Sequence, residues 1–410
     1  MTRLRFLIAV VIVSAGARLR AQILPPGATA QLLNTGFMFT EGPLYDGNGG
    51  VYFSDMGPSA QQATKPSHIW RYDIASDTSA IVDPISGGAN GLIKDTSGRV
   101  ISADRERRQI SRRSASDITT VETVLASKFN NTAFNGPNDL VMDASGGIYF
   151  TDPDYENRHS LPDALYYLSA AGEVFQRRTF TVVGNQRPNG LVLSPDGTIL
   201  YLSIESGKRI MAYDVGANGA LSNDRQFAIT TVNMAGTTLP NITNGPDGLT
   251  IDAAGNVYAA VQNAVFAWNP AGARLFDLPV SQDPTNLKFG GVGGRTLFIT
   301  GGTSLFKVDL NVPAPALGDY DGNGVVDMRD YVVWRNWLGA TANLSADGNG
   351  DRVVDAGDYD VWRAHFGQSD GSGSSSSAFI VVPEPASGLL LWIAGGVGFL
   401  RCRRGRSSTT

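Results

Sequence analysis

The stretch that decides the fold is GPNDLVMDASGGIYFTD, at residues 136–152. Two apolar runs flank a turn that contains Gly146 and Gly147, and the second run, residues 148–151, is rich in β-branched and aromatic side chains. Apolar runs on either side of a glycine turn are typical of a β-hairpin, because glycine readily adopts the positive φ of tight hairpin turns. The stretch is therefore predicted to form two antiparallel strands.

This hairpin pattern recurs along the chain between residues 40 and 305. The other copies span residues 42–55, 90–104, 189–203, 247–261 and 286–300. A repeat of roughly 40 to 50 residues with about four short strands per unit is the signature of a propeller blade. Six copies predict an all-β, six-bladed β-propeller over residues 22–310.

Composition agrees with an all-β chain and narrows the chemistry. The protein has 410 residues, of which 48 are glycine and 17% are charged, and its formal net charge is −5. With no large basic patch in the body of the chain, nucleic acid is not expected as a partner. Three histidines and a single cysteine, Cys402, give little support to a histidine-rich zinc site, a disulfide framework or a cysteine nucleophile.

Oxygen-bearing side chains recur just before the first strand of the predicted blades. They are Glu41, Asn90, Asn138, Asn189 and Asp247. Asn and Asp are also good turn residues, but five such side chains at equivalent positions indicate more than turn formation. The first strand of a blade lines the central channel, so these oxygens are expected to converge on the propeller axis. Carboxylate and amide oxygens suit Ca²⁺, Mg²⁺ or Mn²⁺, and Zn²⁺ can also accept oxygen ligands.

Four short motifs in this order resemble those of the gluconolactonase and regucalcin (senescence marker protein) family. They are Thr40-Glu41-Gly42-Pro43, Gly136-Pro137-Asn138-Asp139, Arg187-Pro188-Asn189-Gly190 and Pro246-Asp247-Gly248. The resemblance covers roughly residues 30 to 308 and implies a six-bladed propeller that hydrolyses sugar lactones with one divalent metal. It further implies that Glu41, Asn189 and Asp247 hold the metal, and that Asn138 is a fourth ligand or binds the substrate.

The expected reaction is attack of water on a lactone carbonyl polarised by a cation, with Asp247 as candidate base and Asn138 as a second catalytic residue. The chain departs from the family pattern at the rim of the expected substrate pocket. Related gluconolactonases often carry Cys-Glu-His after the second-blade turn, where this chain has Ala103-Asp104-Arg105-Glu106. The substrate can therefore differ from that of those relatives. Three alternatives remain open: a cation that only rigidifies the propeller, a non-catalytic carbohydrate- or protein-binding platform, and a phosphotriesterase-like hydrolase.

A second repeat, with a 28-residue period, occupies residues 319–368. Oxygen side chains fall at positions 1, 3, 5, 9 and 12 of each 12-residue loop, which is EF-hand spacing. They are Asp319, Asp321, Asn323, Asp327 and Asp330 in the first loop, and Asp347, Asn349, Asp351, Asp355 and Asp358 in the second. Each loop precedes one short apolar helix, and such pairs resemble dockerin modules, which implies two Ca²⁺ ions. A cohesin-like protein is the partner this resemblance suggests, although a spacer role is equally compatible. Trp334, Trp337 and Trp362 are predicted core residues of this module.

The sequence at both ends of the chain is typical of targeting segments. Residues 1–21 combine two arginines with an apolar run and small residues, the layout of a signal peptide with cleavage after Ala17 or Ala21; an uncleaved anchor is the alternative. Linkers are predicted at 311–318 and at the Gly/Ser-rich 369–381. Residues 382–410 join Pro383-Glu384-Pro385 to an apolar stretch and an arginine cluster, and resemble a PEP-CTERM sorting signal, with a plain membrane anchor as the alternative. The protein is therefore expected to be exported to the cell envelope and to contact the membrane, at least transiently, through its tail.

Overall fold

The computed structural model describes residues 23–57, 66–114, 117–180, 186–231, 243–341, 345–349 and 353–368. The predicted signal peptide, the Gly/Ser-rich linker, the sorting tail and the loop residue Asp351 lie outside the described residues. Among the residues described, no helix is both long and apolar enough to span a bilayer.

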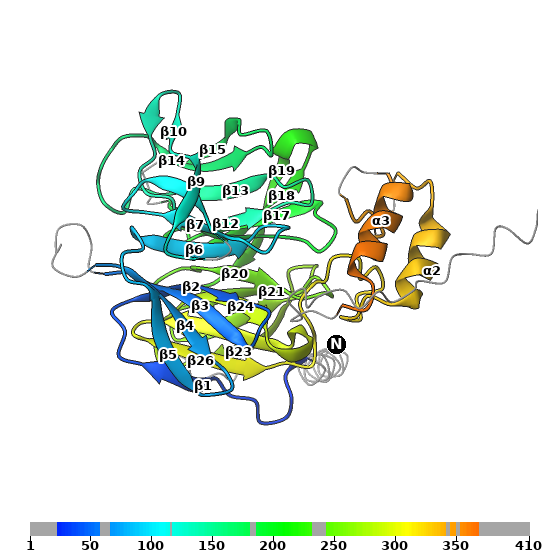
Figure 1. The fold of residues 1–410 in the computed structure, drawn as a ribbon, viewed down its shortest axis with the longest axis horizontal. Helices are drawn as coiled ribbons and strands as arrows, with labels where there is room; N and C mark the ends of the chain where they lie inside the picture. Colours follow the sequence, from blue (N-terminus) through cyan, green and yellow to red (C-terminus); the bar gives the residue numbers. More distant parts are fainter. Residues whose placement is uncertain are drawn as a thin grey trace, which may run out of the picture. The chain divides into compact units, whose positions relative to one another are not determined.

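The propeller prediction is confirmed: six four-stranded antiparallel sheets follow one another along the chain (Figure 1). The first blade contains β2 (Thr40–Tyr45), β3 (Gly50–Asp55), β4 (His68–Asp73) and β5 (Thr78–Asp83). The second contains β6 (Ala89–Lys94), β7 (Val100–Asp104), β8 (Gln109–Arg113) and β9 (Val121–Ala126). The third contains β12 (Leu140–Met142), β13 (Ile148–Asp152), β14 (Asp163–Leu168) and β15 (Val174–Phe180), and is preceded by a small hairpin of β10 (Lys128–Phe129) and β11 (Thr132–Ala133).

The remaining blades complete the ring. The fourth contains β16 (Pro188–Leu193), β17 (Ile199–Ile204), β18 (Arg209–Val215) and β19 (Leu221–Ile229), with the 3₁₀ turn η2 (Ala217–Gly219). The fifth contains β20 (Leu249–Ile251), β21 (Val257–Val261), β22 (Ala264–Trp268) and β23 (Arg274–Pro279). The sixth contains β24 (Pro284–Gly290), β25 (Thr296–Gly301) and β26 (Ser304–Asp309), with the turn η3 (Val292–Gly294), and takes β1 (Gln31–Thr35) as its outermost strand.

Closure of the ring joins the two ends of the repeat region. Strand β1 pairs antiparallel with β26, placing Gln31 opposite Lys307 and Thr35 opposite Ser304. The innermost strands β2, β6, β12, β16, β20 and β24 contact one another in a closed circle. Apolar side chains fill the space between neighbouring blades; one such cluster joins Ile93, Ile101 and Ile110 of the second blade to Phe150 and Tyr166 of the third. The ring therefore fixes the inner strand ends around one axis.

Two short helices form a compact pair after the propeller, α2 (Met328–Trp337) and α3 (Ala356–His365), which contact each other. The pair is internally symmetric: the Trp334 indole donates to the Asp355 carbonyl at 2.7 Å, and the Trp362 indole donates to the Asp327 carbonyl at 2.8 Å. Trp334 and Trp362 are buried, as predicted. The prediction for Trp337 is wrong, because this side chain stands at the end of α2 and is 41% exposed.

Candidate functional site

The inner strands approach so closely that a glycine is required next to several of the predicted site residues. Gly42 follows Glu41 with a φ of +47°, and a Cβ there would lie 2.0 Å from the Asn90 carbonyl oxygen. Gly190 follows Asn189, and a Cβ there would lie 2.5 Å from the carbonyl oxygen of Asp247. The glycines of the repeat therefore allow each blade to place its oxygen side chain directly beside that of the next blade.

Hydroxyl groups of one blade hold the backbone of these residues in the next blade. Ser54 donates to the carbonyl of Asn90 at 2.7 Å, Thr151 to that of Asn189 at 2.9 Å, and Ser203 to that of Asp247 at 2.7 Å. With the carbonyl oxygens engaged between blades, the backbone at each site residue is fixed and only the side chain can turn towards a ligand.

The five predicted site residues occupy two kinds of position relative to the inner strands. Glu41, Asn90 and Asn189 lie within β2, β6 and β16, rather than before these strands as the repeat suggested. Asn138 and Asp247 do lie just before β12 and β20. In the first, second and fourth blades the inner strand pairs from the residue before the site position. The irregularity in register follows Glu41 directly in β2 and includes Asn90 in β6 and Asn189 in β16.

Glu41 and Asp247 are two carboxylates that repel each other across the ring. Burial, with the charge of Asp139 adding to it, raises the pKa of Glu41 to about 8. Burial raises the pKa of Asp247 well above its ordinary value, and the charge of Glu41 is the next largest cause. The Oδ1 atom of Asp247 is inaccessible and has no hydrogen-bond partner within the described part of the chain. Two mutually repelling carboxylates, one with an orphaned oxygen, are arranged to receive a cation.

Asn189 is oriented by a tyrosine. Its Nδ2 donates to the hydroxyl of Tyr155 at 2.9 Å, and that hydroxyl donates in turn to a carboxylate oxygen of Glu205. Asn189 also lowers the pKa of Asp247, so its amide lies close to this carboxyl group. With Nδ2 engaged, Oδ1 is the atom of Asn189 that can bind a cation.

The donor set fits a hard divalent cation. Carboxylate oxygens from Glu41 and Asp247 and an amide oxygen from Asn189 are the ligand types that Ca²⁺, Mg²⁺ and Mn²⁺ prefer. Asn138 is 7% exposed and is held through its backbone, whose carbonyl accepts from Gly91 of the preceding blade at 2.9 Å. The structure thus places Asp247 within electrostatic range of Glu41 and beside the amide of Asn189, and places Asn138 on the adjoining inner-strand end.

Besides Glu205, sequence reasoning missed three further polar residues beside this site. Asp139 is 8% exposed, and its Oδ2 accepts a long hydrogen bond of 3.5 Å from Asn286 of the sixth blade. Asn286 also lowers the pKa of Glu41, so its amide lies between the two carboxyl groups. Burial raises the pKa of Asp139, and the nearby ammonium of Lys288 counteracts this. Two features of the sequence could have indicated these residues. Asp139 stands where most copies of the repeat have glycine, and Asn286 occupies the site position of the sixth copy.

The match to known proteins agrees with this geometry. Residues 39–303 match the family model described as the SMP-30/gluconolactonase/LRE-like region. The chain belongs to this family. It is 28% identical over 308 residues to a gluconolactonase of Zymomonas mobilis, covering 70% of this chain and 82% of that protein.

Two solved structures share the fold. A gluconolactonase of Xanthomonas campestris superposes with a TM-score of 0.60 at 24% identity, covering 71% of this chain and 92% of that one. The calcium-binding protein regucalcin of Agrobacterium tumefaciens superposes with a TM-score of 0.56 at 18% identity, covering 71% and 98%. Membership of the family supports lactone hydrolysis as the activity of the propeller.

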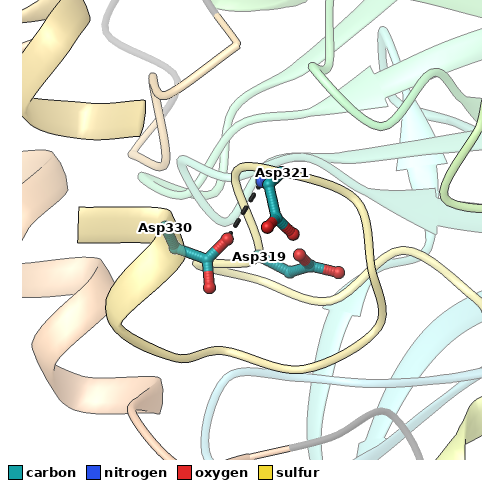
Figure 2. Close-up of side chains that lie close together, drawn as sticks. All are labelled: Asp319, Asp321 and Asp330. Carbon is teal, nitrogen blue, oxygen red and sulfur yellow. Dashed lines mark hydrogen bonds between the residues drawn. The ribbon is translucent and has the colours of Figure 1, made fainter. Parts of the chain in front are cut away.

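A second group of carboxylates lies in the loop before α2 and in the first turn of this helix (Figure 2). Carboxylate oxygens of Asp319, Asp321 and Asp330 lie within 4.8 Å of one another. Asp330 accepts from the backbone N–H of Asp321 at 2.9 Å and of Asp327 at 2.7 Å. Burial, followed by the charge of Asp330, raises the pKa of Asp319 to about 6. Three converging carboxylates in such a loop repel one another unless a cation or protons neutralise them.

The second loop repeats part of this arrangement. Asp358 accepts from the backbone N–H of Asn349 at 3.1 Å and of Asp355 at 2.7 Å, the same two bonds that Asp330 makes. Asp327 and Asp355 cap α2 and α3 in matching capping boxes. The helix pair is thus built from two equivalent loop–helix units, as the 28-residue repeat predicted; the dockerin interpretation and the cohesin-like partner stay predictions.

Proposed function

We propose that the propeller hydrolyses the lactone of a sugar acid in a reaction that depends on a divalent cation held by Glu41, Asn189 and Asp247. The observation that carries this proposal is the Glu41–Asp247 pair, with the unpartnered Oδ1 of Asp247, on a gluconolactonase-family propeller. When bound, the cation would supply electrostatic stabilisation for the negative charge that develops on the lactone carbonyl oxygen.

The side chains then have distinct roles. Asp247 carries an oxygen with no hydrogen-bond partner, so it can accept a proton from the attacking water as a general base. Tyr155 and Glu205 hold the amide of Asn189 in one orientation. Asn138, fixed through its backbone at the neighbouring inner-strand end, can donate from its amide to a substrate oxygen. Glu41 acts as a ligand.

The test is turnover of a lactone panel, with glucono-1,5-lactone as the first member, by the full chain after chelation and after addition of Ca²⁺, Mg²⁺, Mn²⁺ or Zn²⁺. Glu41→Gln and Asp247→Asn are compared with Asp196→Asn, a surface-turn carboxylate that bonds Ser194 and Thr198. We expect cation-dependent turnover that falls by about 10² to 10⁴ in Asp247→Asn, the usual contribution of a general base. The Asp196→Asn variant should match the wild type.

Turnover that survives both chelation and the two site substitutions would refute the proposal. Cation binding without hydrolysis of any lactone would favour a binding platform, and hydrolysis of a phosphotriester in the same panel would favour the phosphotriesterase-like alternative.

We further propose that the loops before α2 and α3 bind Ca²⁺. Support comes from the three converging carboxylates of the first loop and from the shared hydrogen bonds of Asp330 and Asp358. Burial and then the charge of Asp330 raise the pKa of Asp319, and Ca²⁺ would neutralise the repulsion between these carboxylates and so stabilise the loop. Export to the cell envelope is part of the same proposal and rests on the end segments of the sequence alone.

A further inference from the structure

Arg105 has an unusual set of contacts for a buried arginine. It lies in the turn after β7, and its side chain is only 12% exposed. Its Nη1 faces the Oε1 of Glu156 at 3.4 Å, but its Nε and Nη2 are inaccessible and have no hydrogen-bond partner in the described residues. Leaving buried donors unsatisfied is costly, so such atoms call for an explanation.

Arg113 provides the contrast within the same blade. All three of its guanidinium nitrogens are bonded: Nε to Ser102 at 3.1 Å, Nη1 to Asp83 at 2.5 Å and Nη2 to the carbonyl of Ser86 at 2.9 Å. A buried arginine of this blade can thus be fully paired. Among the described residues Arg112 and Arg177 each leave one buried nitrogen, Nε, without a hydrogen-bond partner, whereas Arg105 leaves two on the same edge, which points to a ligand.

The two unpaired nitrogens form one edge of the guanidinium plane. Nε–H and the outer N–H of Nη2 point in parallel, so that this edge accepts the two oxygens of one carboxylate or phosphate group in a bidentate pair. A single hydroxyl group would satisfy only one of them, whereas two neighbouring hydroxyls of a sugar could satisfy both. The positive charge of the guanidinium, together with this geometry, favours an anionic group over neutral hydroxyls.

This edge belongs to the candidate active site. The positive charge of Arg105 lowers the pKa of Glu41, so the guanidinium lies within electrostatic range of a cation ligand. The Cγ of Arg105 lies 3.0 Å from where a Cβ on Gly136 would be, and Gly136 is two residues before Asn138. A substrate held near Glu41 and Asn138 would therefore present its far end close to Arg105.

The backbone of Arg105 is held firmly. Its N–H donates to the carbonyl of Gly88 at 2.9 Å, and its own carbonyl accepts from Arg158 at 3.0 Å. The preceding residue, Asp104, is fully buried against Arg113. An anion-binding group whose turn is fixed in this way loses little conformational entropy when the ligand binds.

We propose that Arg105 determines specificity by binding a carboxylate substituent of the substrate, so that the preferred substrate is a lactone of a sugar diacid that keeps one free carboxylate. The proposal rests on the proposed lactonase function and adds the substrate class to it. Glu156 pairs with Nη1 of Arg105 and leaves Nε and Nη2 without a partner in the described residues.

The test compares kcat/KM for neutral D-glucono-1,5-lactone and anionic D-glucaro-1,4-lactone in the wild type, Arg105→Gln and Arg107→Gln. Arg107 is the matched control, because it lies in the same turn but donates to the carbonyls of Ser86 and Ile85. We expect the preference for the anionic lactone to fall by about 10- to 100-fold in Arg105→Gln, the value of a charged hydrogen-bonded pair. The two lactones are compared within each variant, so that a general loss of turnover in Arg105→Gln cancels in the ratio, and Arg107→Gln should keep the wild-type preference.

An unchanged preference in Arg105→Gln, or a wild-type preference for the neutral lactone, would overturn the inference. A higher kcat/KM for 6-phosphogluconolactone than for the glucarolactone would overturn the carboxylate assignment and indicate that Arg105 binds a phosphate group of the substrate. If neither lactone is hydrolysed, the proposed function is refuted. The role of Arg105 in binding a carboxylate is then tested separately by measuring ligand binding with calorimetry. The wild type should then bind D-gluconate, which carries one carboxylate, about 10- to 100-fold more tightly than the neutral D-glucitol, with the difference lost in Arg105→Gln; equal affinities would refute the inference.

Discussion

Replacing Arg113 with leucine should destabilise the propeller strongly, and more at high pH than at low pH. Arg113 is fully buried and lies between the carboxylates of Asp83 and Asp104, at 2.5 Å and 3.5 Å. Its loss leaves two buried carboxylates without a cation. Breaking a buried pair by removing one partner costs about 3 to 5 kcal/mol, a large part of the roughly 5 to 15 kcal/mol by which domains are stable.

The pH dependence follows from Asp104. Burial raises the pKa of Asp104 above its ordinary value, and the charge of Arg113 is the main influence that opposes this. In Arg113→Leu the pKa of Asp104 should rise further, so the folded state binds its proton more tightly than the unfolded state. The destabilisation is then smallest near and below the ordinary carboxyl pKa and grows as the pH rises through the raised value.

Urea unfolding at pH 5 and pH 8 measures this difference. Adding Asp104→Asn to Arg113→Leu should restore part of the stability and flatten the pH dependence, because the uncompensated charge is gone. Arg99→Leu is the control: Arg99 pairs with Asp95 at the surface and is 26% exposed, so its loss should cost less than about 1 kcal/mol. A cost below about 1 kcal/mol for Arg113→Leu at pH 8, or the same cost at both pH values, would refute the reasoning.

Two further substitutions test the packing of the inner strands and the proposed cation site in the loop before α2. In Gly248→Ala the new Cβ would lie 2.3 Å from the Oδ1 of Asn286. We therefore expect the free energy of unfolding in urea to fall by about 1 to 3 kcal/mol, together with weaker cation binding. Wild-type stability would contradict the close contact between the fifth and sixth blades. In Asp319→Asn one of three converging carboxylates is neutralised, so the gain in thermal stability of the helix pair on adding Ca²⁺ should shrink. Tryptophan fluorescence measures this gain. The control is Asp360→Asn, an exposed change on α3 that should leave the gain intact. An equal response to Ca²⁺ in Asp319→Asn and the wild type would argue against a cation in this loop.

Much of the candidate site could be predicted from the sequence, because the repeat places equivalent residues at equivalent points of the ring. Glu41, Asn189 and Asp247 follow from the repeat and from the family motifs, and the structure places Asp247 close to both of the others. Asp139 and Lys288 could not be assigned in this way. Their pairing joins the third and sixth blades, and no local pattern records which side chains face each other across a closed ring.

The sequence by itself determined the number of blades, the two loop–helix units and the oxygen-rich character of the inner-strand ends. These properties depend on hairpin turns, strand alternation and loop spacing, which act over a few residues. Only the tertiary structure decided how β1 closes the ring with β26, which nitrogens of Arg105 are left unpaired, and why Trp337 is exposed while Trp362 is buried. Each of these depends on contacts between residues far apart in the chain, where burial and distance, rather than residue type, fix the environment of a side chain.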